Sequence, residues 1–222
     1  MNALFSSLHL IDDPAPRPAA LNMAIDEVLL TTVGLPVLRF YCWSEPSVSF
    51  GYFGIFDEAQ QFARDRALVR RWTGGGIVPH GHDLTYSIMI GPADATYALS
   101  SRLIYRCVHS AVERALRAMG VQAQLSEGAS PKTSDACFAN PVVADLIEGG
   151  RKIAGAAQRK TRQGLLHQGS IQRSGLEQNF RRAMANLLAG EIIIEQISTP
   201  TLAAADALAG QKYASDGWLH RR

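Results

Sequence analysis

The stretch DACFANPVVADLIEGGRKIAG, residues 135–155, holds two side chains that could do acyl chemistry together. Cys137 ends a loop of small and polar residues, and Lys152 follows a glycine pair in a turn between two predicted strands. A thiol of ordinary pKa, about 8.5, is only slightly ionised at neutral pH, and a nearby cation raises the thiolate fraction. The pair favours a cysteine nucleophile and a lysine that donates to an acyl carbonyl or a phosphate. Considered alone, Cys137 could equally be a small residue of the core, and Lys152 could equally be a solvated surface charge.

A second group lies in RRWTGGGIVPHGHD, residues 70–83. Its three consecutive glycines would weaken a strand, so the backbone there is expected to adopt positive φ or to approach another group closely. Successive N–H groups of such a loop can cradle an anion or a carbonyl, with Arg70 and Arg71 supplying the countercharge. A tight hairpin is the alternative for the glycines alone. The two arginines before them and His80 after them favour a binding loop.

The same stretch raises the question of a metal. His80 and His82 would share one face of an extended segment, as some zinc sites require, with Asp83 beside them. However, no cysteine or further histidine follows at ligand spacing, so the sequence predicts no metal site. One of the two histidines is expected to contact substrate or a residue that does. Cys42 and Cys107 are expected at core-facing positions of a strand and a helix.

Hydrophobic periodicity predicts the scaffold that positions these residues. Helices are predicted at 18–34, 57–67, 100–120, from 179 and from 198; strands are predicted at 36–43, 47–53, 83–90, 142–147, 151–157 and 164–172, and a short apolar run lies at 191–197. The first helix is expected to bury Leu21, Ile25, Val28 and Leu29; the long helix is expected to bury Ile104, Cys107, Val108, Val112, Ala115, Leu116 and Met119. This order predicts one α+β domain over residues 1–222, with a mixed, largely antiparallel sheet packed with helices.

Composition narrows the class of protein. Of the 222 residues, 47% are hydrophobic and 19% charged, which is enough for a substantial core. Basic pairs are scattered along the chain, a pattern that suits phosphate or an acidic partner better than nucleic acid. Three widely spaced cysteines predict no disulfide framework and a reducing, cytoplasmic setting. The first residues lack a basic region and soon turn acidic, so neither a secretory leader nor a membrane span is predicted.

Several segments together resemble one family, the lipoate-protein ligase and octanoyltransferase group of the biotin/lipoyl ligase superfamily. The matching stretches follow the family's order along nearly the whole chain: NMAIDEVLL (22–30), LRFYCW (38–43), SVSFGYF (47–53), RRWTGGGIVPH (70–80), LTYSI (84–88), ACFANPVVADLI (136–147), GRKIAGAAQRKTRQGLLHQGSI (150–171) and KYASDGW (212–218). The resemblance implies a biotin/lipoyl protein ligase-like fold, in which a mixed sheet and helices surround an acyl tunnel.

The resemblance also implies roles for particular residues. Lys152, in a KIAG-type motif that ends at Gly155, would contact the acyl carbonyl and any phosphate, with Gly155 bordering the substrate. The acyl pocket would be lined by the glycine loop and its neighbours: Arg70, Arg71, Thr73, Gly74, Gly75, Gly76 and His80. Cys137 would carry the acyl group as a thioester, and its partner Lys152 would help to stabilise the oxyanions.

The implied reaction moves an octanoyl or lipoyl group from acyl carrier protein to Cys137, and then to a lysine of a lipoyl-accepting domain. Such acceptors are the lipoyl domains of 2-oxoacid dehydrogenases and the glycine cleavage H protein. Thioester exchange is nearly isoenergetic and amide formation is downhill, so this route requires no cofactor. The basic pairs would dock the acidic carrier domains, and neither nucleic acid nor a membrane is expected as a partner.

Two alternatives stay open. A lipoate or octanoate ligase would instead form an acyl-adenylate with ATP and magnesium, and Gly76 at the end of the loop resembles the ligases. The chain ends soon after KYASDGW, which leaves no room for the accessory domain of many ligases and favours the transferase. The other alternative is a catalytically silent protein that only binds acyl groups or carrier domains.

Overall fold

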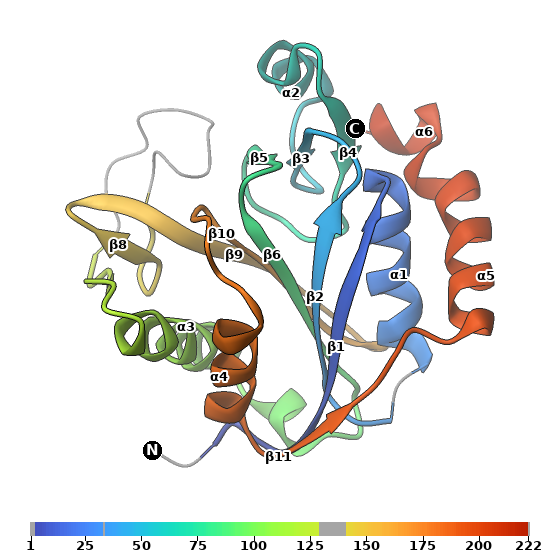
Figure 1. Cartoon of the computed structure of the whole chain (residues 1–222). Coiled ribbons are helices and arrows are strands. Elements are labelled where there is room, and N and C mark those ends of the chain that lie inside the picture. The colour runs from blue at the N-terminus through green and yellow to red at the C-terminus, as the bar shows by residue number, and fades with distance from the viewer. Residues whose placement is uncertain (1–2, 33, 129–140, 222) are drawn as a thin grey trace.

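The computed structural model describes residues 3–32, 34–128 and 141–221 and contains one large mixed sheet (Figure 1). Its eight strands are ordered β11-β1-β2-β6-β10-β9-β8-β7. Their bounds are β1 (Phe5–Arg17), β2 (Val37–Trp43), β6 (Leu84–Ile90), β7 (Gln124–Leu125), β8 (Leu146–Glu148), β9 (Arg151–Thr161), β10 (Gly164–Ile171) and β11 (Ala189–Ile194). β1 runs parallel to β2 and β11, and the other neighbours pair antiparallel. The predicted α+β fold with a largely antiparallel sheet is confirmed.

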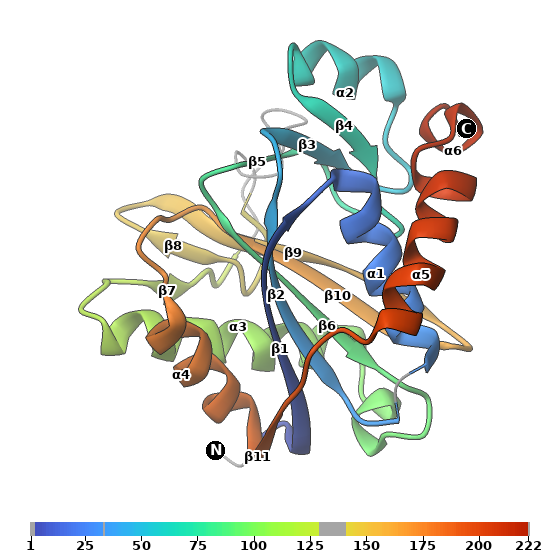
Figure 2. The same cartoon turned by 45° about the vertical axis from the view of Figure 1, so that its right-hand side comes forward.

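Helices cover both faces of this sheet (Figures 1 and 2). One face carries α1 (Ala19–Thr32) and α5 (Thr199–Leu208), and the other carries α3 (Ser101–Ala118) and α4 (Gln178–Leu188). Side chains alternate between the faces along β2, so Leu38 and Phe40 join the cluster under α3 and α4, while Val37 and Tyr41 join the cluster under α1 and α5. Because both faces are covered, the first five residues of β2, from Val37 to Tyr41, are all buried, whereas Cys42 and Trp43 are partly buried.

A second sheet of three strands lies at one end of the molecule, next to α2 (Phe56–Ala63) and α6 (Asp216–Leu219) (Figure 1). Its strands are β4 (Ala67–Arg70), β3 (Ser47–Phe50) and β5 (Val78–His80), with β3 in the centre. The glycine loop 74–76 connects β4 to β5. A 3-10 turn (Ala95–Ala98) precedes α3, and a π-helical turn (Ala209–Tyr213) joins α5 to α6.

The long helix α3 largely follows its sequence pattern. Ser100 caps its start, since Oγ accepts from the backbone N–H of Leu103 at 3.2 Å. The predicted stripe is buried at Ile104, Val108, Val112, Ala115 and Leu116. The prediction is wrong at Met119, which is 47% exposed because the helix ends one residue earlier. Cys107 is half-buried, and burial raises the pKa of its thiol.

Helix α1 is confirmed, but the predicted buried face is half wrong. Ile25 and Leu29 are buried as expected, whereas Leu21 and Val28 are only partly buried. The polar side chains of Asn22 and Asp26 are buried at 0% exposure in their place. A pattern based only on apolar residues cannot identify the buried face of a helix when that face also carries polar side chains with hydrogen-bond partners.

Candidate acyl-binding site

A narrow cavity lies between the two sheets and α1. Its volume is about 420 Å³, part of it open to solvent. Its walls come from α1, both sheets and the small residues of β9: Met23, Tyr41, Trp43, Ser49, Arg71, Val78, His80, Thr85, Gly155, Ala156, Ala157, Gln168, Gly169 and Ser170. The walls are mostly apolar and carry a few polar side chains, which is typical of a site for a small molecule.

Arg71 holds the glycine loop in shape. The side chain is 6% exposed, and its Nη2 donates to the carbonyls of Gly74 and Gly76, each at 2.9 Å. Gly75 between them has φ +87°, a conformation that favours glycine. Gly51 of the neighbouring turn must also be glycine, because a Cβ there would lie 2.0 Å from the Gly75 carbonyl oxygen. Gly51 and Gly75 thus allow a close approach of two loops at the rim of the cavity.

His80 belongs to a chain of hydrogen bonds in the cavity wall. Its Nδ1 lies 2.8 Å from Asp83 Oδ2 and its Nε2 lies 2.7 Å from Ser49 Oγ, to which Arg71 Nη1 also donates at 2.7 Å. Burial lowers the pKa of His80 although Asp83 opposes this, and Asp83 keeps a lowered pKa because His80 and its other donors outweigh its burial. A neutral His80 therefore donates from Nδ1 to the carboxylate and accepts the Ser49 hydroxyl proton at Nε2. Its ring also stacks on Trp43, with ring centroids 4.1 Å apart.

Lys152 lies on β9 beside the small residues that line the cavity. Its side chain is 3% exposed, and Nζ lies 2.7 Å from Oδ2 of the fully buried Asp145. Lys152 is therefore not a solvated surface charge, because an ion pair inside the fold holds its ammonium. Gly155 makes room for the pair, because a Cβ there would lie 2.5 Å from Lys152 Cε and 2.7 Å from Nζ. The glycine of the KIAG segment is therefore explained by the lysine that packs over it.

Asp145 is held in turn by α3 and the segment before β8. It accepts from the Tyr105 hydroxyl at 2.5 Å and from the backbone N–H of Val142 at 2.7 Å. Burial, with Asp145 close by, raises the pKa of Tyr105, so this phenol stays protonated and donates. The adjacent Ala144 has φ +68°, a strained value for alanine, and its carbonyl lies 2.5 Å from Nδ1 of His109. Several contacts from different parts of the fold therefore fix the position of the carboxylate that pairs with Lys152.

Three buried histidines surround this region and predict a pH dependence of stability. Burial lowers the pKa of His80, lowers that of His109 to about 4, and lowers that of His167 well below the ordinary value. Unfolded histidines titrate at about 6.5, so below that pH the unfolded chain binds protons that the folded chain refuses. We expect the free energy of unfolding to fall between pH 7 and 5.5, by roughly 1 kcal/mol for each of His109 and His167, with a further contribution of the same sign from His80.

Urea unfolding at pH 7, 6.25 and 5.5 measures this slope. His82 is exposed, so His82→Gln is a matched control that should leave the slope unchanged. An equal free energy of unfolding at pH 7 and pH 5.5 would show that the buried rings do not resist protonation.

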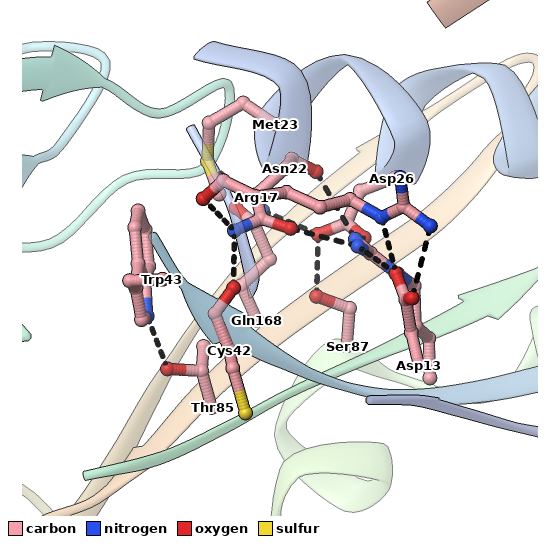
Figure 3. A network of polar contacts seen from close by, with 11 residues as sticks. Asp13, Arg17, Asn22, Met23, Asp26, Cys42, Trp43, Thr85, Ser87 and Gln168 are labelled. Atoms are coloured by element: carbon pink, nitrogen blue, oxygen red, sulfur yellow. Dashed lines mark hydrogen bonds and ion pairs between the residues drawn. The ribbon is translucent and has the colours of Figure 1, made fainter. Parts of the chain in front are cut away.

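Behind the cavity lies a buried polar network that links α1, β1, β2 and β10 (Figure 3). Asp26 accepts from Arg39 Nη1 at 2.9 Å, from Ser87 Oγ at 2.5 Å and from Gln168 Nε2 at 2.9 Å. Gln168 lines the cavity, and its Oε1 accepts from Thr73 at 2.8 Å. The network therefore connects the floor of the cavity to the glycine loop. Its signal in the sequence is weak and consists of the acid in α1 and the arginine amid apolar neighbours in β2.

Most of the predicted substrate-binding residues come together here. Arg71, His80 and Gly155 line the cavity, Lys152 lies over Gly155, and Thr73 with Gly74, Gly75 and Gly76 forms the loop at the rim. Arg70 does not face the cavity, since its guanidinium donates to backbone carbonyls of Tyr52, Gly54, Trp218 and Leu219. Cys137 lies in residues 129–140, outside the described part of the chain. Among the described residues, no group of three His, Cys, Asp or Glu side chains could hold a metal ion.

Solved structures with the same architecture are lipoate protein ligases. The fold matches Ta0514, a putative lipoate protein ligase from T. acidophilum, with a TM-score of 0.75 at 21% identity, covering 97% of this chain and 99% of that one. It also matches lipoate-protein ligase A bound with ATP, with a TM-score of 0.74 at 21% identity over 97% and 98% of the two chains. These likenesses establish the class of fold.

The chain belongs to the lipoyl protein ligase A/B catalytic domain family, whose model matches residues 18–191. It is similar to Octanoyltransferase LipM of Oceanobacillus iheyensis, 39% identical over 165 residues, which are 70% of this chain and 60% of that protein. Octanoyltransferase LipM of Carboxydothermus hydrogenoformans is 37% identical over 161 residues, which are 68% and 59% of the two chains. The chain thus spans about three fifths of the length of these curated relatives. No helix in the described residues is long and apolar enough to cross a membrane.

Proposed function

We propose that this protein is an octanoyltransferase of protein lipoylation. It takes an octanoyl group from the thioester of acyl carrier protein onto Cys137, and passes it to a lysine amine of a lipoyl-accepting domain. The observation that carries the proposal is the buried Lys152–Asp145 pair beside a narrow cavity walled by glycine and alanine of β9. Relatives named octanoyltransferase, 32–39% identical, support the same activity.

In the first step, the Cys137 thiol loses its proton, and its thiolate attacks the acyl carbonyl. A new S–C bond forms while the acyl bond to the donor sulfur breaks, and the donor leaves as a thiolate that takes up the released proton. In the second step, the acceptor lysine attacks the new thioester, the amide forms, and the amine proton returns to the cysteine. Both steps pass through an oxyanion, for which Lys152 is the proposed donor, supplying roughly 3 kcal/mol. Neither step consumes ATP or needs a metal.

The chain path supports a role for Cys137 at this place. Val142 donates to Asp145, so the backbone leaves residues 129–140 directly beside the Lys152–Asp145 pair. Cys137 lies five positions before Val142, a span of at most about 18 Å when fully extended. A chain of this length can bring the thiol to the cavity, where the buried cation of Lys152 would favour its thiolate.

The decisive experiment mixes the protein with octanoyl-acyl carrier protein, without ATP, and records the intact mass. The proposal expects an added octanoyl group that neutral hydroxylamine removes, followed by transfer to an apo lipoyl domain or apo H protein. Acceptor modification from free octanoate only in the presence of ATP and magnesium would overturn the proposal in favour of a ligase. Binding of the acyl group with no turnover under either condition would make the protein a silent acyl binder.

Gly155→Ala is expected to slow acyl transfer more than it destabilises the fold. The new methyl group would displace the end of the Lys152 side chain, whose far atoms can move at small cost. We expect at least a tenfold slower transfer, because an ångström of misplacement at a reacting group costs up to about 10²-fold. The free energy of unfolding should change by about 1 kcal/mol or less. Gly210→Ala, where a Cβ meets no atom within 4 Å, is the matched control. Equal rates for both variants would contradict the placement of Lys152.

A further inference from the structure

The turn between β3 and α2 exposes two large apolar side chains. Phe53 is 86% exposed and Ile55 is 57% exposed. The backbone N–H of Gly54 donates to Gly51 at 2.9 Å, which closes the turn, and a surface hollow runs from Tyr52 to Asp57 and on to His220 and Arg221. Exposed apolar residues that share one turn differ from the scattered single ones found on any surface.

A buried arginine holds this turn rigid from behind. Arg70 is 1% exposed, and Nη1 donates to the carbonyls of Tyr52 at 2.9 Å and Gly54 at 2.8 Å. Its other nitrogens donate to Trp218 and Leu219, with distances from 2.6 to 3.1 Å. The guanidinium thus ties the turn to the C-terminal helix α6. An apolar side chain presented by a fixed backbone loses little freedom on binding, which is the property of an interface anchor.

The turn is continuous with the rim of the cavity. Gly51 packs against Gly74 and Gly75, and the N–H of Tyr52 donates to the Thr73 carbonyl at 2.8 Å. Gly75 is exposed, and its Cα faces Arg71 and Ala157, both of which line the cavity. A molecule seated on Phe53 would therefore also touch the glycine loop.

The charges around the turn indicate the chemistry of that molecule. Guanidinium groups lie against the Tyr52 ring at two places, Arg159 at 4.4 Å and Arg221 at 4.6 Å from its centroid. Within the described part of the chain, neither guanidinium has an ion pair with a carboxylate. Asp57, which lines the same hollow as Arg221, and Glu58 are exposed in the first turn of α2 and add charge of the opposite sign. A partner that places carboxylates near the arginines and an apolar spot on Phe53 would dock in one orientation.

We propose that the turn 51–55, with Arg159 and Arg221, is the docking surface for the lysine-bearing acceptor domain; this rests on the proposed function. The reach of the two substrates favours the acceptor over the donor. A lysine side chain is only four methylene groups long, so its domain must touch the rim for the amine to enter the cavity. A carrier thioester on a long prosthetic arm can enter while its carrier protein stands further off.

The test compares Phe53→Ser and Ile55→Ser with the wild-type chain. Ile194→Ser is the matched control, because Ile194 is also 57% exposed and lies in β11 at the far end of the molecule (Figures 1 and 2). The rate of self-acylation from octanoyl-acyl carrier protein and the kcat and KM for an apo lipoyl domain are measured separately. We expect the KM for the acceptor to rise about tenfold in each surface variant, with kcat within twofold, and to stay unchanged in the control.

The outcomes separate the docking surface from the activity itself. An unchanged acceptor KM in Phe53→Ser and Ile55→Ser, with an active wild-type enzyme, would overturn the docking surface alone. Loss of self-acylation in these variants would show that the turn binds the donor, and would also overturn the proposed docking surface for the acceptor. A wild-type dimer that Phe53→Ser converts to a monomer in gel filtration would make a second copy the occupant. No transfer by the wild-type chain would overturn the proposed function.

Discussion

Lys152→Met is expected to lower the rate of acyl transfer by about 10²- to 10³-fold, the effect of removing one well-placed oxyanion donor. Methionine keeps much of the length and volume of lysine but has no charge and no donor. The substitution also leaves the fully buried Asp145 without its cation, although Tyr105 and the Val142 N–H still donate to it. Removal of one partner of a buried pair costs about 3–5 kcal/mol, so the variant should also unfold more easily.

The double variant Lys152→Met with Asp145→Asn separates chemistry from stability. It removes both charges, so no uncompensated carboxylate remains and most of the lost free energy of unfolding should return. The transfer rate should stay low, because the donor is still absent. Urea unfolding and single-turnover transfer to an apo lipoyl domain measure the two effects. A double variant that regains its rate together with its stability would reduce Lys152 to a structural residue.

Arg39→Met is expected to cause the largest loss of stability of any single change outside the proposed reaction site. Arg39 is 0% exposed and donates to Asp26, Asp13 and Asn22 at 2.7–2.9 Å. Without it, Asp26 keeps only its bonds from Ser87 and Gln168, and a buried carboxylate loses its cation. We expect a loss of about 3–5 kcal/mol in the free energy of unfolding.

An exposed arginine provides the comparison. Arg117 is 63% exposed in its side chain and lies 3.8 Å from Glu113 on α3, so Arg117→Met should cost less than about 1 kcal/mol. Both free energies come from urea unfolding at pH 7. Similar costs for the two variants would show that the network behind the cavity contributes no more than a surface pair. A shifted acyl-chain preference in Arg39→Met would further show that Asp26 positions Gln168 in the cavity wall.

The fold suits the proposed reaction because the walls of the cavity come from two different sheets, each of which holds its polar groups in place. The small residues of β9 come from the large sheet, while the glycine loop connects two strands of the small sheet. Arg71, Ser49, His80 and Asp83 hydrogen-bond across the small sheet and fix one wall, and the Lys152–Asp145 pair borders the other. A substrate between them would meet groups that are already held in place, which is what electrostatic stabilisation of a transition state requires.

Much of this protein can be predicted from local sequence. The alternation along residues 36–43 predicts a strand, and the spacing of apolar residues in α3 predicts its core-facing stripe. The three glycines and Arg71 predict a binding loop, and the KIAG segment identifies Lys152. These signals are local because strand period, helix period and positive φ are properties of a few neighbouring residues.

Only the tertiary structure determines which side chains pair with one another. Nothing in the spacing joins Lys152 to Asp145, Gln168 to Asp26, or Ser49 to His80, since such pairs form only when distant strands and helices meet. The tertiary structure also separates two neighbours, Arg71 in the cavity wall and Arg70 behind the turn that carries Phe53, because Arg70 is the last residue of β4 and Arg71 begins the loop that follows. The residue types determine which chemistry is available to this chain. Burial and long-range pairing determine which of those residues are neutral, charged, fixed or exposed, and so which of them can act.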